Sequence, residues 1–130
     1  MKIWVNGCFD ILHRGHFELF NYAKSLGDFL VVGVDTDEKV AQDKGPDRPY
    51  NKLEDRVYAL ESIRAIDDVW VFDTRGQLED QIRRYSPDML VVGSDWKGKE
   101  VVGGQYAKEI VYFDRMGNYS TTNILNNESK

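Results

Sequence analysis

Residues 6–16 read Asn-Gly-Cys-Phe-Asp-Ile-Leu-His-Arg-Gly-His and connect a short β-branched segment, residues 3–5, to a stretch with helical periodicity. The glycines permit a tight turn and a close approach to the backbone. The start of a helix adds free N–H groups and the positive end of the helix dipole. The stretch therefore predicts a buried strand, a turn suited to a polyphosphate, and a helix.

Further strand-like and helix-like segments alternate along the rest of the chain. Residues 29–34, 69–72, 89–92 and 110–113 form further short apolar runs, as expected for strands buried on both faces. The intervening segments place apolar residues at helical spacing, namely Leu19, Ala23 and Leu26, then Leu53, Val57, Leu60 and Ile63, then Leu78 and Ile82. We predict a five-stranded parallel sheet flanked by helices, a doubly wound, Rossmann-like α/β fold with ligands at the carboxyl ends of its strands.

Local signals suggest where the elements begin and end. Gly27 is placed to end the first helix, and Asn51 with Glu54 resembles a capping box at the start of the second. Residues 43–49 have no clear period and are expected to form a loop ordered by itself or by a ligand. A chain of 130 residues has room for one domain, residues 1–130, and we expect its tail, residues 126–130, to fray.

The composition narrows the classes of partner. A net charge of -5 argues against nucleic acid or an anionic membrane as partner, because both attract a cationic face. The single cysteine, Cys8, allows no internal disulfide and fits a reducing compartment. The N-terminus lacks the apolar core of a signal peptide, and no apolar run reaches membrane-spanning length. We therefore expect a cytoplasmic protein without membrane or nucleic-acid partners.

The two histidines of the chain, His13 and His16, both lie in the strand-to-helix turn. A spacing of three residues places them on one face of the first helical turn. Taken alone, each would be an ordinary surface or capping histidine. Their position beside glycines, where α/β folds bind ligands, favours a role toward a phosphorylated substrate.

These residues resemble the signature of the cytidylyltransferase-like nucleotidyltransferase family. Its Gly-x-Phe-Asp and His-x-Gly-His segments are matched by Gly7, Phe9, Asp10, His13, Gly15 and His16. A Gly-x-Asp-Trp segment is matched by Gly93, Asp95 and Trp96, and an Arg followed by Ser-Thr-Thr by Arg115, Ser120, Thr121 and Thr122. The three motifs occur in the family's order and the likeness spans residues 3–125.

The resemblance implies a reaction in which an acceptor phosphate attacks the α-phosphorus of a nucleoside triphosphate and pyrophosphate leaves. It implies catalytic roles for His13, His16, Lys44 and Arg115. It implies nucleotide contacts from Gly7, Cys8, Phe9, Asp10, Gly15, Gly93, Asp95, Trp96, Ser120, Thr121 and Thr122, although Ser120 alone would serve as a plain helix cap. Mg²⁺ is the expected cofactor, held mainly by substrate phosphates and by no dedicated protein ligands.

By the same resemblance, the candidate contacts of the acceptor phosphate are four cations, Lys44, Arg48, Arg56 and Arg64. Of Arg56 and Arg64, one is expected to hold this phosphate and the other to organise the pocket. Arg56 and Arg64 are eight residues apart, so on one helix they differ by about 80° and both can face the cleft. Solvated helix arginines and a solvated loop lysine are the plainer interpretations. Cys8 is interpreted as a small packing residue, since the proposed transfer needs no covalent intermediate.

Several functions compete with this interpretation. Class I aminoacyl-tRNA synthetases share a related histidine signature, but this acidic chain leaves no room for a tRNA-binding domain. A nucleotide-binding module without catalysis stays open, because a fold alone does not fix function. Within the family, residues 45–49 favour an adenylyltransferase that acts on D-glycero-D-manno-heptose 1-phosphate in ADP-heptose synthesis. Residues 95–99 look more like the glycerol-3-phosphate cytidylyltransferases. We expect ATP and a sugar phosphate, the heptose 1-phosphate, as the substrate pair, with CTP and a polyol phosphate, glycerol 3-phosphate, as the alternative.

A homodimer is the expected assembly, in part because family relatives commonly pair. Trp4, Trp70 and Trp96 also give this short chain more large aromatic surface than one small core easily covers. The expected partners are thus the two small-molecule substrates and a second copy of the chain.

Overall fold

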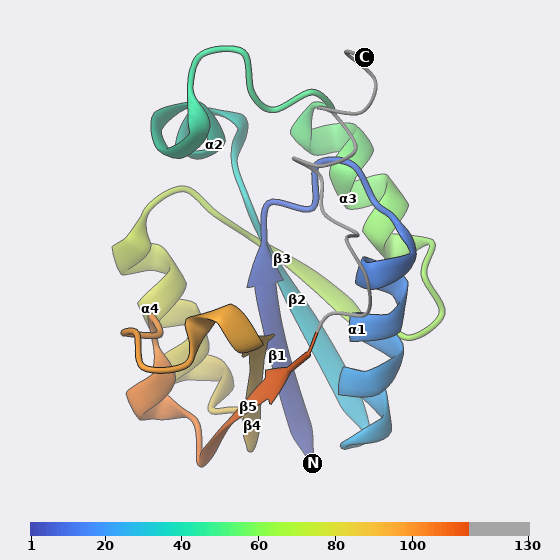
Figure 1. The fold of residues 1–130 in the computed structure, drawn as a ribbon, viewed down its shortest axis with the longest axis vertical. Coiled ribbons are helices and arrows are strands. Elements are labelled where there is room, and N and C mark those ends of the chain that lie inside the picture. Colours follow the sequence, from blue (N-terminus) through green and yellow to red (C-terminus); the bar gives the residue numbers. More distant parts are fainter. Residues whose placement is uncertain (115–130) are drawn as a thin grey trace.

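A computed structural model describes residues 1–114 as five strands with helices on both faces of the sheet (Figure 1). The strands are β1 (Lys2–Gly7), β2 (Phe29–Asp35), β3 (Asp68–Phe72), β4 (Met89–Gly93) and β5 (Glu109–Phe113). The helices are α1 (Arg14–Ser25), α2 (Asp37–Lys44), α3 (Leu53–Glu61) and α4 (Arg75–Tyr85), with short 3-10 turns η1 (Ser94–Trp96) and η2 (Gly104–Tyr106). The five strands predicted from the apolar runs are confirmed.

All neighbouring strands run parallel, in the order β3-β2-β1-β4-β5. The chain moves outward from β1 to β3 and then returns across the other face to β4, which confirms the doubly wound topology. β1 pairs with β2 along its whole length, but with β4 only at Ile3 and Trp4. Beyond that point β4 pairs with β5 alone, so β1 and β4 separate toward their carboxyl ends and open a crevice where such folds bind ligands.

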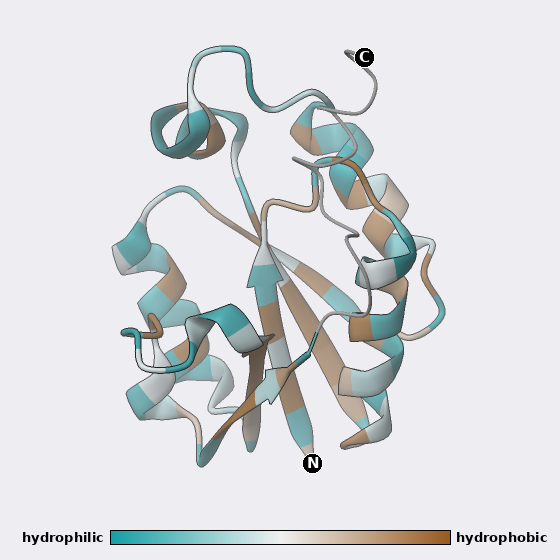
Figure 2. Cartoon of the chain, viewed as in Figure 1, coloured by the Kyte–Doolittle hydropathy of each residue, from teal (hydrophilic) through white to brown (hydrophobic). Residues whose placement is uncertain are grey.

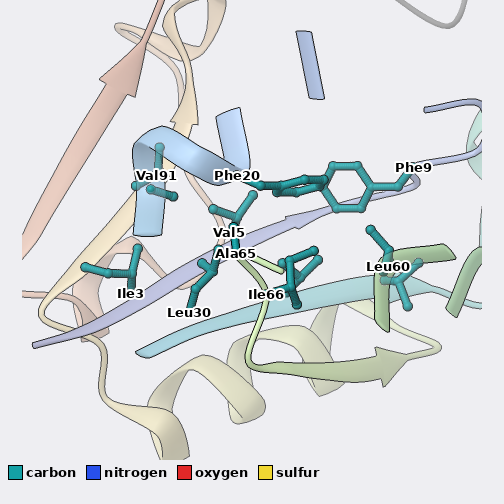
Figure 3. Close-up of a cluster of buried hydrophobic side chains, with 12 residues drawn as sticks. Ile3, Val5, Phe9, Phe20, Leu30, Leu60, Ala65, Ile66 and Val91 are labelled. Carbon is teal, nitrogen blue, oxygen red and sulfur yellow. The ribbon is translucent and has the colours of Figure 1, made fainter. Parts of the chain in front are cut away.

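Alternate side chains of β1 enter two separate cores. Ile3 and Val5 pack with Phe20 of α1 and Leu60 of α3 in the larger core (Figure 3). Trp4 points to the opposite face, where it packs with α4. Figure 2 shows apolar, brown stretches along the strands, and helices in which brown and teal residues alternate. A sheet apolar on both faces explains why the strands were recognisable as uninterrupted apolar runs.

Gly33 of β2 provides the space that the buried Trp4 ring needs. A Cβ atom at this position would lie 2.6 Å from Trp4 Cζ2, closer than real side chains approach. Trp4 is fully buried and its Nε1 donates to Asn6 Oδ1 at 3.0 Å. Trp4, one of the three tryptophans on which the dimer prediction partly rests, is therefore covered by the core of its own chain.

The helices depart from the sequence predictions in three places. The pattern missed α2, because Val40 is its only buried residue and it has no apolar stripe. The predicted capping box at Asn51 is wrong, since the N-cap of α3 is Lys52 and Asn51 instead bonds to the β1–α1 turn. α3 also ends at Glu61, so the prediction that Arg64 shares a helix with Arg56 is wrong.

Within residues 1–114, no helix combines the length and the apolarity that a membrane crossing requires. The predicted phosphate-binding residues Arg115, Ser120, Thr121 and Thr122, and the predicted tail at 126–130, lie outside the described residues.

Candidate active site

A cavity of about 610 Å³ occupies the crevice at the carboxyl ends of the strands. The β1–α1 turn forms its centre. β2 and α2 line one flank, and β4 with η1 lines the other. Most of the predicted site residues that the structure describes thus meet at one place, and those that line the cavity are Gly7, Cys8, Phe9, Asp10, His13, Gly15, His16, Lys44, Arg48, Gly93, Asp95 and Trp96.

His13 and His16 form a reciprocal cap at the start of α1. His13 is the N-cap residue, and its Nδ1 accepts from the backbone N–H of Gly15 at 3.1 Å. The Nδ1 of His16 accepts from the backbone N–H of His13 at 3.2 Å. The two rings lie 3.9 Å apart, centroid to centroid, with 31° between their planes. The predicted pairing of the histidines on the first helical turn is confirmed.

This cap fixes which nitrogen of each neutral ring carries its proton. A nitrogen that accepts a hydrogen bond carries no proton, so in each ring the N–H group is at Nε2. Both imidazoles line the cavity as Nε2–H donors beside the amino end of a helix dipole. Such donors suit an oxygen that gains negative charge.

Asp10 organises the loop that follows α2. Its buried carboxylate accepts from Arg48 Nε at 3.1 Å and from the backbone N–H groups of Tyr50 and Asn51, each at 2.7 Å. Asn51 Nδ2 returns a bond of 2.6 Å to the Asp10 carbonyl. Three protein donors thus occupy the Asp10 carboxylate, which holds Arg48 and the loop in position beside the cavity.

Arg56 is buried in the fold and does not line the cavity. Its guanidinium donates to Cys8 O at 3.0 Å, to Asn51 O at 3.0 Å and to Asp37 Oδ1 at 2.8 Å. Its side chain is 0% exposed, which leaves no access for a phosphate. Arg56 is therefore not an acceptor contact in this structure, but it connects the β1–α1 turn, the loop before α3 and α2, which agrees with the pocket-organising role expected for one of the two arginines.

Phe9 and Cys8 support the turn through packing. Phe9 adopts φ of 49°, a left-handed backbone conformation that costs energy for a side chain of this size. Its buried ring contacts Phe20 at a centroid distance of 5.1 Å and His16 at 5.6 Å. Burial raises the pKa of the Cys8 thiol, although Lys44 and Arg56 lower it. A thiol that stays protonated suits packing, as predicted.

One flank of the cavity carries three charged residues that sequence reasoning missed, Asp35, Lys39 and Asp43. Lys39 Nζ lies 2.6 Å from Asp43 Oδ2 and 3.6 Å from Asp35 Oδ2. Burial lowers the pKa of Lys39, but the hydrogen bond to Asp43 and the charge of Asp35 raise it above its ordinary value. Burial raises the pKa of Asp35, which the charge of Lys39 offsets only in part. Their spacing of four residues was the one signal in the sequence that could have identified them, because side chains four apart on a helix are neighbours.

The opposite flank is formed by Gly93, Asp95 and Trp96 after β4. A Cβ atom at Gly93 would lie 2.6 Å from Asp95 Oδ1, so glycine lets the Asp95 carboxylate sit against the backbone. Trp96, which lines the cavity, is 46% exposed. This flank offers a carboxylate, which can accept from a ribose hydroxyl or a base amine, and an aromatic face, and both residues are among the predicted nucleotide contacts.

Arg48 reaches the cavity from the loop that follows α2. Its Nη2 atom is buried and meets no hydrogen-bond acceptor among residues 1–114. A buried guanidinium N–H without an acceptor is costly, and a phosphate oxygen would remove that cost. By contrast, Arg64 is exposed and does not line the cavity.

The described residues also bear on the expected metal. Among residues 1–114, no three His, Cys, Asp or Glu side chains are grouped to hold a metal ion. Mg²⁺ accepts few protein ligands and retains several waters. Mg²⁺ held through substrate phosphates stays a prediction.

Two relatives of known sequence resemble the chain over nearly its whole length. The chain is 48% identical to the bifunctional protein HldE of a Nitratiruptor species over 123 residues, which are 95% of this chain and 26% of that protein. It is 44% identical to the bifunctional protein HldE of Helicobacter hepaticus, again over 95% of this chain and 25% of the relative. The chain thus spans about a quarter of the length of the curated relatives it matches.

Solved structures share the fold. A lipopolysaccharide core biosynthesis protein from Thermoplasma volcanium matches with a TM-score of 0.70 at 24% identity, covering 92% of this chain and 98% of the other. Pantothenate synthetase from Thermus thermophilus matches with a TM-score of 0.65 at 15% identity, covering 95% of this chain and 60% of the other. Residues 4–127 match the cytidylyltransferase-like family. Since this match covers nearly the whole chain and includes the histidine turn, the chain belongs to the cytidylyltransferase-like family.

Proposed function

We propose that the chain transfers a nucleoside monophosphate from a nucleoside triphosphate to a sugar phosphate. An oxygen of the acceptor phosphate forms a bond to the α-phosphorus, and the bond from that phosphorus to the bridging oxygen breaks, releasing pyrophosphate. The acceptor phosphate is already ionised at neutral pH, so the reaction needs positioning and charge stabilisation more than a base. The observation that carries the proposal is the His13–His16 pair, two Nε2–H donors at a helix amino end within the cavity.

In this proposal His13 and His16 donate to α-phosphate oxygens that gain charge in the transition state. Gly7 and Gly15 let the triphosphate approach the backbone, and the amino end of α1 attracts it. Arg115, Ser120, Thr121 and Thr122 are proposed to hold the remaining phosphates. Asp95 and Trp96 are proposed to meet the nucleoside on the β4 flank.

The acceptor phosphate is proposed to bind Lys44 and Arg48. Lys44 ends α2 and Arg48 is held by Asp10, so both cations reach the cavity from the same loop. The buried Nη2 of Arg48 supports this assignment, because it lacks an acceptor within residues 1–114. Mg²⁺ is proposed to neutralise the triphosphate through phosphate oxygens, with waters completing its shell.

We propose ATP and D-glycero-D-manno-heptose 1-phosphate as the substrate pair. The identity of 48% with a protein named HldE, and the resemblance of residues 45–49 to the heptose enzymes, support this choice. The segment at residues 95–99 favours CTP and glycerol 3-phosphate instead. We further propose a cytoplasmic homodimer.

The substrate proposal is tested by measuring pyrophosphate release for ATP and CTP, each with heptose 1-phosphate and with glycerol 3-phosphate, in the presence of Mg²⁺. We expect ATP with heptose 1-phosphate to give the highest kcat/KM, and EDTA to abolish it. A hundredfold preference for CTP with glycerol 3-phosphate would select the alternative. Nucleotide binding without pyrophosphate release for any pair would identify a binding module and refute the enzyme proposal.

A further inference from the structure

The proposed transfer reaction assigns no role to three charged residues that line the cavity. Asp35 ends β2, and Lys39 and Asp43 follow at one-turn intervals on α2, all three lining the cavity. The side chains of Asp35 and Lys39 are only 13% and 18% exposed. Placing a carboxylate and an ammonium group so deep costs free energy, and residues at a binding site are where such a cost is expected.

The geometry leaves Asp35 able to accept further hydrogen bonds. Lys39 lies close to Asp43, at 2.6 Å, and makes only a longer contact of 3.6 Å with Asp35. An ionised carboxylate has about four lone-pair sites. Asp35 therefore offers acceptor capacity and Lys39 a neighbouring donor, a combination that matches adjacent hydroxyl groups of a polyol. The Phe72 ring, 5.9 Å from Lys39 Nζ, adds an apolar surface beside them.

The position of Asp35 and Lys39 indicates which of the two substrates they would contact, namely the acceptor. Two substrates must meet at the histidines of the β1–α1 turn, so they approach from opposite flanks. The β4 flank carries Asp95 and Trp96, whereas the β2 flank carries Asp35 and Lys39 and leads to Lys44. An acceptor whose phosphate binds Lys44 and Arg48 extends its carbon chain over the β2 flank.

We propose that Asp35 and Lys39 form a hydroxyl-binding subsite that selects a polyhydroxylated sugar phosphate as acceptor. The inference rests on the proposed transfer reaction and specifies its acceptor class. Hydrogen bonds from substrate hydroxyls to a buried carboxylate discriminate strongly, because an acceptor without hydroxyls leaves the carboxylate unpaired.

The subsite is tested with Asp35→Asn and Lys39→Gln, using ATP with heptose 1-phosphate and with methyl phosphate, which carries no hydroxyl on its carbon. Asp80→Asn is the matched control, since Asp80 is paired with Arg84 on the surface of α4, away from the cavity. We expect both subsite variants to lower kcat/KM for heptose 1-phosphate by about ten- to a hundredfold. The KM for ATP and kcat/KM for methyl phosphate should stay within about twofold, and the control should match the wild type.

An equal loss with both acceptors, or no loss with heptose 1-phosphate, would overturn the subsite. If the wild type transfers nucleotide to no acceptor, the proposed function fails and the subsite is tested by calorimetric titration with heptose 1-phosphate. A Kd raised about tenfold in Asp35→Asn, but not in Asp80→Asn, then supports it. An unchanged Kd, or no binding by the wild type, refutes it.

Discussion

His13 and His16 cap the first helix with their Nδ1 atoms and line the cavity with the same rings. A variant that removes a ring therefore removes a cap as well. The sequence was sufficient to place both histidines on one helical turn, because their spacing alone does so. It did not predict the reciprocal cap, which depends on the backbone conformation at His13. The consequence is that stability and chemistry must be separated by the choice of substitution.

The first prediction compares His13→Ala with His13→Asn, and His16→Ala with His16→Gln. Asn at an N-cap and Gln three residues later preserve capping bonds without an imidazole. All four variants should lose about a hundred- to a thousandfold in kcat, since each loses one imidazole Nε2–H group proposed to donate to the transition state. Only the Ala variants should also lose about 1 kcal/mol in the free energy of unfolding. Steady-state kinetics and urea denaturation measure the two effects.

Wild-type kcat in His13→Asn or His16→Gln would show that the rings serve only as caps. A change confined to KM would indicate that they bind the ground state and the transition state equally.

The second prediction concerns the cost of ionising Asp35. Its pKa is raised, chiefly by burial, so the folded state binds the proton of Asp35 more tightly than the unfolded chain does. The ionised carboxylate thus lowers stability at neutral pH, and this cost disappears as the pH falls through the pKa of Asp35, above its ordinary value of 3.8. Asp35→Asn, which cannot ionise, should have a higher Tm than the wild type at pH 7, and the difference should shrink in acid.

Thermal unfolding of both proteins between pH 7 and pH 4 checks this sign. A variant that is less stable than the wild type at pH 7 would show that the pair with Lys39 outweighs the burial of Asp35.

At the scale of elements, the strands were predictable and the connections were not. Each strand is an uninterrupted apolar run, because both faces of the sheet are covered. α2 has a single buried residue, and its order depends on contacts made by distant parts of the chain. The sequence did not predict the burial of Arg56 either, since its three acceptors come from Cys8, Asn51 and Asp37. Helical spacing cannot distinguish a buried guanidinium from a solvated one.

The third prediction tests Arg56 as a tie between these connections. Arg56→Met should lower the free energy of unfolding by about 3–5 kcal/mol, because it leaves Asp37 and two carbonyl groups without their buried donor. Arg64→Met is the control, and as an exposed position it should change stability by no more than about 0.5 kcal/mol. Urea denaturation followed by fluorescence gives both values. Equal, small effects at the two positions would contradict the role of Arg56 as a tie between these connections.

At the scale of the whole molecule, one topological feature positions the site. β1 leaves β4 after Trp4 and stays paired with β2, so the cavity lies between strands that the sheet order places side by side. The alternation of strands and helices predicted the carboxyl edge as the site. The sequence did not predict the two flanks of the cavity, or the proposed separation of nucleotide from acceptor. Both depend on the strand order and on the position of α2.

The fourth prediction is that the chain forms a homodimer in solution. Tyr50 and Tyr58 are 69% and 73% exposed, and covering such aromatic surface favours association. Light scattering at micromolar concentration should give twice the 15.0 kDa of one chain. A mass of one chain under these conditions would contradict the prediction, while leaving the proposed chemistry intact because all described site residues lie on one chain.

The central claim is that the α-phosphorus of the triphosphate is transferred, and a label at that atom tests it directly. The protein is incubated with Mg²⁺ and heptose 1-phosphate and with ATP labelled either at the α- or at the γ-phosphorus. We predict that the α label appears in the nucleoside-diphosphate sugar and the γ label in pyrophosphate, with both transfers reduced about a hundred- to a thousandfold in His16→Gln. A γ label in the sugar product, or an α label that remains in ATP, would contradict the account.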